Sequence, residues 1–333
     1  MPREATAGAA HRAGRERGAR RARPSTASTR DWSCTGPTAA SSTANLEPRD
    51  LPLGVTGPAQ ATVPVEARLA ERKGAFDVQR YADAAAATKA IEDREVYGAV
   101  VAAPDRQTLF IASAASPTVA GLLRENLAAP GQRVLDVVPT DPDDPRGTAF
   151  ASMVLPLVLA GLIGGAVVSL LMRPGLGEVG ILVATAAASG LVTIVMVQGW
   201  LDVIEGPWLL NAGVIALAVL AIASVIAGLQ ALIGPVGIAL GAVLMIFVGN
   251  PWSGIASAPE LLPTAAGLTG RLLPPGAGGS LLRNTAFFDG AGSGGPLAVL
   301  LVWTVLGLGG IMVGAAMQRR RTPVTSSRSR TTA

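Results

Sequence analysis

The second half of the chain is dominated by long apolar runs. "FASMVLPLVLAGLIGGAVVSLLM" (150–172) and "VGILVATAAASGLVTIVMVQGWL" (179–201) carry no charge. At about 1.5 Å per residue, a helix over each can cross a hydrocarbon core of about 30 Å. The run 207–252 is too long for one span and is interrupted by Gly234-Pro235, which would stop a helix. The pattern predicts a membrane all-α bundle over 150–318 with five transmembrane helices, at 150–172, 179–201, 207–229, 233–252 and 296–317.

The arginines predict the orientation of these spans. Arg319, Arg320 and Arg321 follow the last span, so the positive-inside rule makes 319–333 a cytoplasmic basic tail. Counting back places the loop 253–295 and residues 51–149 outside the plasma membrane. Trp200, Trp208 and Trp252 would then lie at the outer interface, which indole rings prefer. We therefore expect a multi-pass cell-membrane protein whose C-terminus is cytoplasmic.

Residues 51–140 have a different pattern, with short apolar runs separated by polar segments. Strand-like enrichment and helical composition alternate. Asp83 is a plausible N-cap of one of the helices. The pattern predicts an N-terminal extracytoplasmic α/β domain over 51–149, with strands at 51–55, 76–81, 96–102, 107–113 and 133–138 and helices at 64–73, 82–94 and 117–128.

Residues 1–50 form an Arg/Ser/Ala-rich segment without an apolar run. An external domain must be carried across the bilayer, which requires a signal peptide or a preceding spanning helix. With this composition we expect residues 1 to about 46 to be disordered. Because residues 1–50 contain neither a signal peptide nor a spanning helix, we also expect that an apolar helix before Leu51 was lost through a wrong start or a frameshift.

Composition and charge narrow the function. Half of the 333 residues are apolar and only 15% are charged, which is too apolar for an ordinary soluble domain. The net charge is +4, yet residues 51–149 hold 10 Lys or Arg against 13 Asp or Glu, so nucleic acid is not an expected partner. Single Cys34 and His11 exclude a disulfide framework, a Cys/His metal cluster and a triad with a histidine base.

The remaining motifs favour structural roles over chemistry. "GAGSGG" (290–295) matches G-x-G-x-x-G but follows no strand, and no Walker A, G-x-S-x-G or H-E-x-x-H sequence occurs. "TDPDDPRG" (140–147) lacks the Gly and terminal Glu of an EF-hand and suits a stiff linker. The acidic cluster at Glu92, Asp93 and Glu95 is typical of a solvated helix end. We expect no enzyme activity, no cofactor and no metal site.

Within the predicted spans, polar residues and closely spaced glycines are the candidates for function or packing. Polar groups in hydrocarbon either join helices or mark a pathway, and joining helices is the favoured interpretation for Gln198, Asn211, Gln230 and, near a span end, Asn250. G-x-x-x-G spacing permits close helix approach, within the chain or in a homodimer. It occurs at Gly161/Gly165, Gly237/Gly241 and Gly310/Gly314.

Two segments carry a family resemblance. "AATKAIEDREVYGAVVAAPDRQTLFIASAAS" and "LLPPGAGGSLLRNTAFFDGAGSGGPLAVLLVWTVLGLGG" resemble the phage-infection-protein (YhgE/Pip-like) group of membrane proteins, which is related to type-two ABC export permeases. The resemblance covers roughly 51–317 and implies one spanning helix before the external domain and five after it. It also implies that the loop 253–295 sits over the outer mouth of a transport path, with Leu261, Leu262, Arg271, Leu272 and Arg283 as candidate residues. Arg271 and Arg283 would reach headgroups or the external domain.

The leading hypothesis is a permease-like membrane protein for export or handling of an envelope-associated or hydrophobic substrate. Its expected partners are the lipid bilayer, a separate ATPase subunit and a second copy of the chain. The turn "RPGLGEV" (173–179) is too short for a coupling helix, which argues against ATP-driven transport. The alternative is a membrane-anchored receptor or scaffold that transports nothing; a membrane enzyme ranks third.

Overall fold

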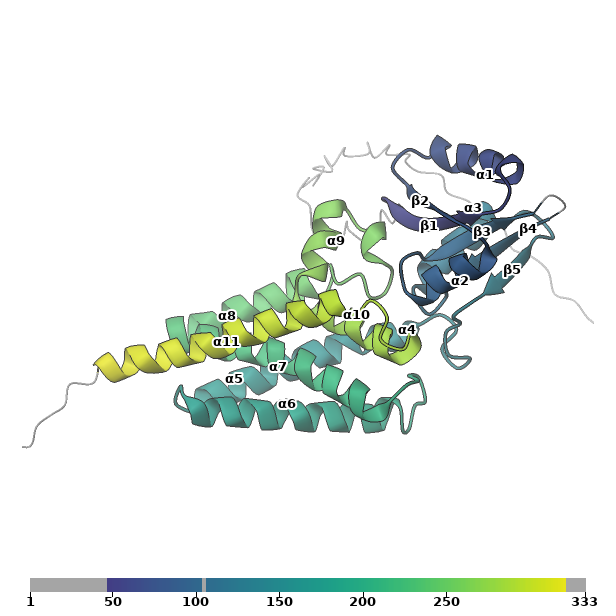
Figure 1. Ribbon diagram of the computed structural model, residues 1–333. Helices are drawn as coiled ribbons and strands as arrows, with labels where there is room; N and C mark the ends of the chain where they lie inside the picture. The colour runs from purple at the N-terminus through teal and green to yellow at the C-terminus, as the bar shows by residue number, and fades with distance from the viewer. Residues whose placement is uncertain (1–46, 104–105, 322–333) are drawn as a thin grey trace, which may run out of the picture. The chain divides into compact units, whose positions relative to one another are not determined.

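The computed structural model describes residues 47–103 and 106–321. They form a small α/β sheet domain followed by a mostly helical region (Figure 1). The predictions for residues 1–46 and for the tail beyond Arg321 concern parts of the chain outside the described residues.

The sheet has five strands in the order β2-β1-β3-β4-β5. Strand β1 is parallel to β2 and β3, β3 is antiparallel to β4, and β4 is parallel to β5. All five predicted strands are present, so the prediction of an α/β domain is confirmed. The strands are β1 (Leu51–Thr56), β2 (Phe76–Tyr81), β3 (Gly98–Ala102), β4 (Gln107–Ile111) and β5 (Arg133–Asp136).

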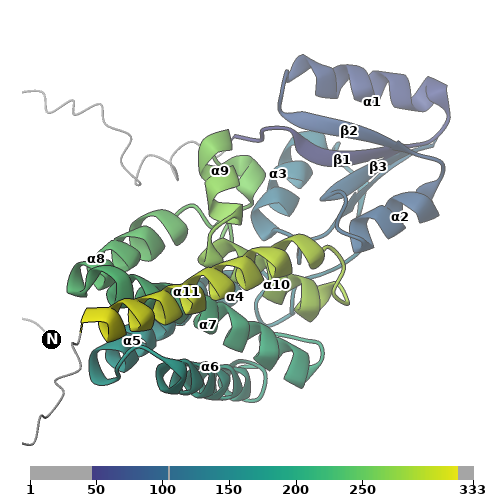
Figure 2. The same ribbon diagram turned by 60° about the vertical axis from the view of Figure 1, so that its left-hand side comes forward.

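Helices cover both faces of the sheet, which buries alternate strand residues on opposite sides. Helices α1 (Ala59–Glu71) and α3 (Pro117–Leu127) pack with Leu53, Val100 and Leu109 in one core. Helix α2 (Ala84–Glu92) packs on the other face with Ala99 and Phe110. Figure 2 shows α1 and α2 on opposite sides of the sheet. The predicted N-cap is confirmed, since the Asp83 carboxylate accepts a 2.8 Å hydrogen bond from the Ala86 N–H.

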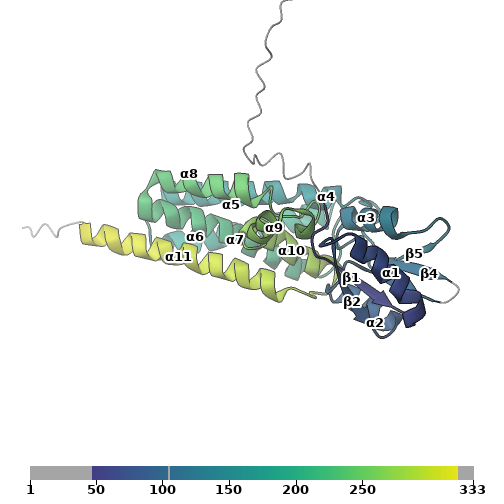
Figure 3. The same cartoon turned by 90° about the horizontal axis from the view of Figure 1, so that it is seen from above.

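Among the described residues, four helices are long and apolar enough to cross a membrane, with mean hydropathies of 2.2 to 2.6. The first spans Thr148–Leu171 and comprises α4 (Thr148–Ser152) and α5 (Val154–Leu171). The others are α6 (Leu176–Val197), α7 (Trp208–Ile233) and α11 (Gly294–Arg321). In its most apolar window α7 is 72% buried, against 22–39% for the others, and α5, α6 and α11 pack around it (Figures 1 and 3).

The segment predicted as the fourth span, 233–252, contains a shorter apolar helix over Pro235–Gly249. Helix α8 (Pro235–Val243) continues into η2 (Leu244–Gly249), one turn of π-helix. At 1.5 Å per residue its 15 residues reach about 22 Å, less than the hydrocarbon core. Four of the five predicted spans therefore have the expected length, and the span predicted over 233–252 stays a prediction.

The loop 253–295 is folded. It contains the 3-10 turn η3 (Pro259–Leu261), α9 (Thr264–Arg271) and α10 (Pro274–Phe287). Helix α10 is almost wholly buried and packs on α7, α11 and α9. The loop therefore has its own helices, which pack between the long helices and the sheet domain.

The long helices expose large apolar side chains. Leu171 is 78% exposed and Leu209 is 82% exposed, and similar residues lie along α5, α6 and α11. Such a surface is unfavourable in water and favourable against lipid tails. The fold is compatible with a multi-pass integral membrane protein.

Candidate functional site at the junction of sheet and helices

The loop 253–295 packs against both faces of the sheet. Leu261 is fully buried in the core that α1 and α3 form on one face. Phe288 is 5% exposed and lies in the core that α2 forms on the other face. Two parts of the loop, 27 residues apart, therefore hold the sheet between them.

Hydrogen bonds reinforce this contact at the start of α3. The Ser116 hydroxyl, which also caps α3 through the Val119 N–H, donates to the Ser257 carbonyl. Thr118 donates to the Ala256 carbonyl at 3.1 Å. At the other end of the loop segment, the Arg49 N–H donates to the Glu260 carbonyl at 2.9 Å. The backbone of 256–260 is thus bound directly to the sheet domain.

A cavity of about 430 Å³ lies at this junction, between the segment 94–97 of the sheet domain and the helices. Its other walls are η3, α9, α10 and the first two turns of α11. The volume is in the range of small-molecule sites. We call this the junction cavity; its charged or polar lining is Arg94, Glu95, Tyr97, Glu260, Arg271, Ser280, Arg283 and Asn284, and its large apolar lining is Val96, Leu268, Leu272 and Val299.

Two arginines of the junction cavity have aromatic and neutral partners. Arg283 is 6% exposed; it donates to the Ile255 carbonyl at 2.8 Å and lies 4.8 Å from the Phe150 ring centre. Arg94 donates to the Asn284 side chain and lies 5.0 Å from the Phe288 ring centre. Within 47–103 and 106–321, no carboxylate forms an ion pair with either arginine. Their nearest contacts are the two aromatic rings and neutral oxygen acceptors, and the Glu260 carboxylate acts on Arg94 electrostatically from beyond ion-pair distance.

The carboxylate of Glu260 is already engaged. It accepts a 2.8 Å hydrogen bond from the Tyr97 hydroxyl and pairs with Arg271. Glu95, the other acidic residue of the lining, lies 3.3 Å from the Tyr81 hydroxyl. With three arginines against two carboxylates, the lining has an excess of positive charge.

Burial shifts the ionisation of these groups. Desolvation, with a smaller contribution from the nearby Arg94 charge, lowers the pKa of Arg283 to about 10. Desolvation likewise lowers the pKa of Arg94. Desolvation and the Glu260 charge raise the pKa of the Tyr97 hydroxyl well above its usual value. At neutral pH Arg283 is therefore charged and Tyr97 is neutral.

The structure separates the five candidate outer-mouth residues into two sets. Arg271, Leu272 and Arg283 line the junction cavity. Leu261 and Leu262 are buried at 0% and 2% exposure. Arg271 pairs with Glu260, and Arg283 contacts Ile255 and Phe150. The sheet domain contributes its own arginine, Arg94, which donates to Asn284 on α10.

Two of the polar candidates in the spans join neighbouring segments. Asn211 on α7 donates to the Glu205 carbonyl at 2.8 Å and accepts from Thr285 on α10 at 2.8 Å. Gln198 donates to the Gly206 carbonyl at 2.7 Å and lies 3.5 Å from Asn211. Gln230 differs: its buried side-chain oxygen has no hydrogen-bond partner in the described part of the chain.

All six candidate glycines face α7. A Cβ at Gly161 or Gly165 would lie 2.7 Å from Ile222 or 2.6 Å from the Ala223 carbonyl oxygen. The other four glycines approach the second half of α7: Gly237 meets Leu229, Gly241 meets Ile226, Gly310 meets Gly228, and Gly314 meets Ala231. The close approach that the spacing predicted thus takes place inside one chain.

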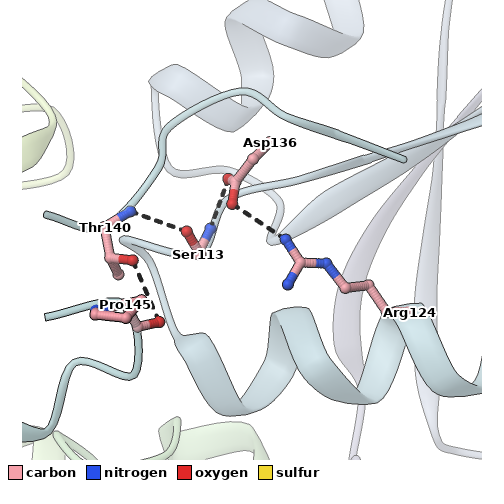
Figure 4. Close-up of polar contacts among 5 residues, drawn as sticks. All are labelled: Ser113, Arg124, Asp136, Thr140 and Pro145. Atoms are coloured by element: carbon pink, nitrogen blue, oxygen red, sulfur yellow. Dashed lines mark hydrogen bonds and ion pairs between the residues drawn. The ribbon is translucent and has the colours of Figure 1, made fainter. Parts of the chain in front are cut away.

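Hydrogen bonds hold both ends of the linker 140–147 in place. Figure 4 shows Asp136 accepting from the Ser113 N–H at 3.0 Å and pairing with Arg124, while Ser113 accepts from the Thr140 N–H. Asp144 is buried and accepts from the N–H groups of Thr148, Ala149 and Phe150. Its carboxylate satisfies the free donors at the start of the first long helix.

Sequence reasoning missed several residues of this region. Arg94, Tyr97, Glu260 and Asn284 were absent from the candidates because their partners lie more than 160 residues away in the chain. Glu178 was assigned to a short turn, yet it is in the first turn of α6 and fully buried, with neither oxygen paired among the described residues. A glutamate directly before an apolar run was the available signal.

Comparison of the chain with protein-family models, with curated proteins and with solved structures finds no match. The fold and the lining of the junction cavity therefore carry the functional argument.

Proposed function

We propose that the chain is a permease-like membrane protein that takes a hydrophobic or envelope-associated molecule into the junction cavity. The observation that carries this proposal is the place of the cavity, between the sheet domain and the first two turns of α11. A molecule bound there contacts both the α/β domain and a helix long enough to span the bilayer. The resemblance to the phage-infection-protein group and the export permeases is part of the same proposal.

The proposal places the sheet domain and the junction cavity outside the plasma membrane and the C-terminus in the cytoplasm. Arg319, Arg320 and Arg321 at the end of α11 support this orientation. So does Trp200, which is 79% exposed near the opposite end of α6 from Arg173. In this arrangement Pro235–Gly249 is a short fourth crossing, because the chain must return to the outer side before α11 begins.

A receptor or scaffold without transport is the second candidate. The packing of the loop 253–295 on both faces of the sheet supports this candidate. Leu261 and Phe288 are buried in the cores on the two faces, so moving the sheet domain away from the loop would expose them. Transport would need either a movement of the sheet domain relative to the helices or a path through the helices. A separate ATPase partner and a homodimer belong to the permease proposal alone.

Photo-crosslinking tests the proposal. The full chain is reconstituted in liposomes with a trace of a phosphatidylcholine that carries a diazirine near its headgroup, and crosslinked peptides are mapped. The proposal predicts crosslinks to 268–272 and 295–299. Crosslinks confined to the outward-facing sides of α5 and α6 would contradict it. A fluorescent-lipid transbilayer assay on the same liposomes then separates the permease from the scaffold.

A further inference from the structure

Arg94 and Arg283 hold two positive charges at the junction cavity without a carboxylate partner in the described chain. Burying a charge is costly unless an opposite charge or several hydrogen bonds compensate it. Each arginine here uses one carbonyl or amide oxygen and one aromatic ring. A guanidinium has five N–H donors, so most of the donor capacity of both groups is left for another acceptor.

A negatively charged group would balance the charges of Arg94 and Arg283. Glu260 acts on Arg94 electrostatically, but its single negative charge is already matched by Arg271, with which it pairs. Glu95 interacts with Tyr81, on the sheet side. Guanidinium groups bind phosphate and carboxylate oxygens through paired N–H donors, which makes them suited to an anionic headgroup.

The rest of the lining is suited to an apolar chain. Leu268 and Leu272 on and after α9 are 60% and 54% exposed, and Pro296 and Val299 come from the first turns of α11. The Trp303 N–H donates to the Leu272 carbonyl at 2.7 Å and holds this end of α9 against α11. The apolar part of the lining thus begins where a membrane helix begins, at the depth where lipid headgroups meet acyl chains.

We propose that the junction cavity binds an anionic amphiphile, with its phosphate or carboxylate between Arg94 and Arg283 and its apolar chain along Leu268, Leu272 and Val299. This inference rests on the proposed function and specifies the chemical class of the molecule. The volume of about 430 Å³ accommodates a headgroup, and the chain continues along α11.

Competition between two lipids tests the inference. The full chain in neutral detergent is given equal amounts of dioleoyl phosphatidylglycerol and dioleoyl phosphatidylcholine, and retained lipids are counted by native mass spectrometry. We expect about a tenfold preference for phosphatidylglycerol, as for a charge-assisted hydrogen-bonded pair. The preference should fall to less than about threefold in Arg94→Gln and in Arg283→Gln, and Arg94→Lys should keep part of it.

Arg80→Gln and the double variant Arg319→Gln/Arg320→Gln are the controls. Arg80 is 67% exposed and paired with Glu66, and the other two lie at the far end of α11. Both controls should retain the preference. A preference that is lost only in the double variant would assign it to the basic end of α11 and overturn the inference.

Further arms of the experiment separate the remaining outcomes. Inorganic phosphate at the lipid concentration should leave the bound phosphatidylglycerol in place; its displacement would identify a simple anion site and overturn the amphiphile. Equal retention of both lipids, together with crosslinks at 268–272, would overturn the anionic preference while leaving the proposed function standing. Absence of those crosslinks would contradict the proposed function itself.

Because Arg283 is buried, each variant is first shown to be monodisperse, and Arg94→Gln alone suffices if Arg283→Gln does not fold.

Discussion

The guanidinium carbon of Arg94 lies 5.0 Å from the centre of the Phe288 ring. Arg94 follows α2 of the sheet domain, and Phe288 ends α10 of the helical region. The same ring is buried in the core that covers one face of the sheet. This one side chain therefore contributes both apolar packing and a cation–π contact to the attachment of the sheet domain.

Truncating Phe288 should loosen that attachment. We expect Phe288→Ala to cost about 3–5 kcal/mol of stability, as is usual for a buried phenylalanine. Thermal unfolding of the detergent-solubilised chain measures the loss, and hydrogen exchange should increase in α2. Phe247→Ala, at a ring that is 63% exposed, is the matched control and should change neither. Equal effects of the two substitutions would show that Phe288 does not hold the domain.

Asp144 should be needed for the start of the first long helix. Its carboxylate accepts from three backbone N–H groups, so Asp144→Ala leaves these donors without their partner. We expect a loss of about 1–2 kcal/mol, typical of a strong N-terminal cap. The neighbouring Asp143 is exposed, and Asp143→Ala should be close to neutral in the same thermal unfolding measurement. A neutral Asp144→Ala would refute the capping role.

Close packing against α7 should make Gly165 intolerant of a side chain. The Cβ of Gly165→Ala would meet the Ala223 carbonyl oxygen at 2.6 Å, which forces α5 away from α7. We expect a loss of about 1–3 kcal/mol from overpacking. Gly164→Ala, one residue away, meets its nearest atom at 3.6 Å and should be neutral or slightly stabilising. Thermal unfolding of both variants in one detergent makes the comparison.

Capture of phosphatidylglycerol should be independent of pH from about pH 6 to pH 9. The pKa of Arg283 is lowered only to about 10, so its charge is lost above this range. The raised pKa of Tyr97 keeps its hydroxyl protonated throughout. Lipid retention by native mass spectrometry at several pH values measures this. A titration with a midpoint inside the range would contradict the assignment of the site to arginines. The charged and titratable groups facing the site are Arg94, Glu95, Tyr97, Glu260, Arg271 and Arg283.

Local patterns predicted most of the fold. The strands of the sheet were located because β-rich runs alternate with helical segments, and their observed register follows the buried positions Leu51, Leu53 and Val55. Four helices long and apolar enough to span a membrane were located because hydropathy over about 20 residues depends on composition alone. The ends of α7 and α11 shifted by a few residues, since helix ends depend on capping and packing.

The junction cavity could be predicted only in part. Arg271, Leu272 and Arg283 were found through the family resemblance, whereas Arg94 and Tyr97 belong to a segment that has no local pattern of a site. Their partners Asn284 and Glu260 lie across the domain boundary. Likewise, the burial of Leu261 and Phe288 in the sheet domain depends on long-range packing, which periodicity within the loop does not encode.

Measuring which side of the membrane the sheet domain and the end of α11 face tests the central claim most directly. Single cysteines at Glu125→Cys in the sheet domain and Gln318→Cys near the end of α11 are introduced into a Cys34→Ser background. Both are labelled with a membrane-impermeant maleimide on intact cells and again after permeabilisation. The account predicts labelling of position 125 on intact cells and of position 318 only after permeabilisation. Labelling of position 318 alone on intact cells would place the junction cavity on the cytoplasmic side and contradict the account.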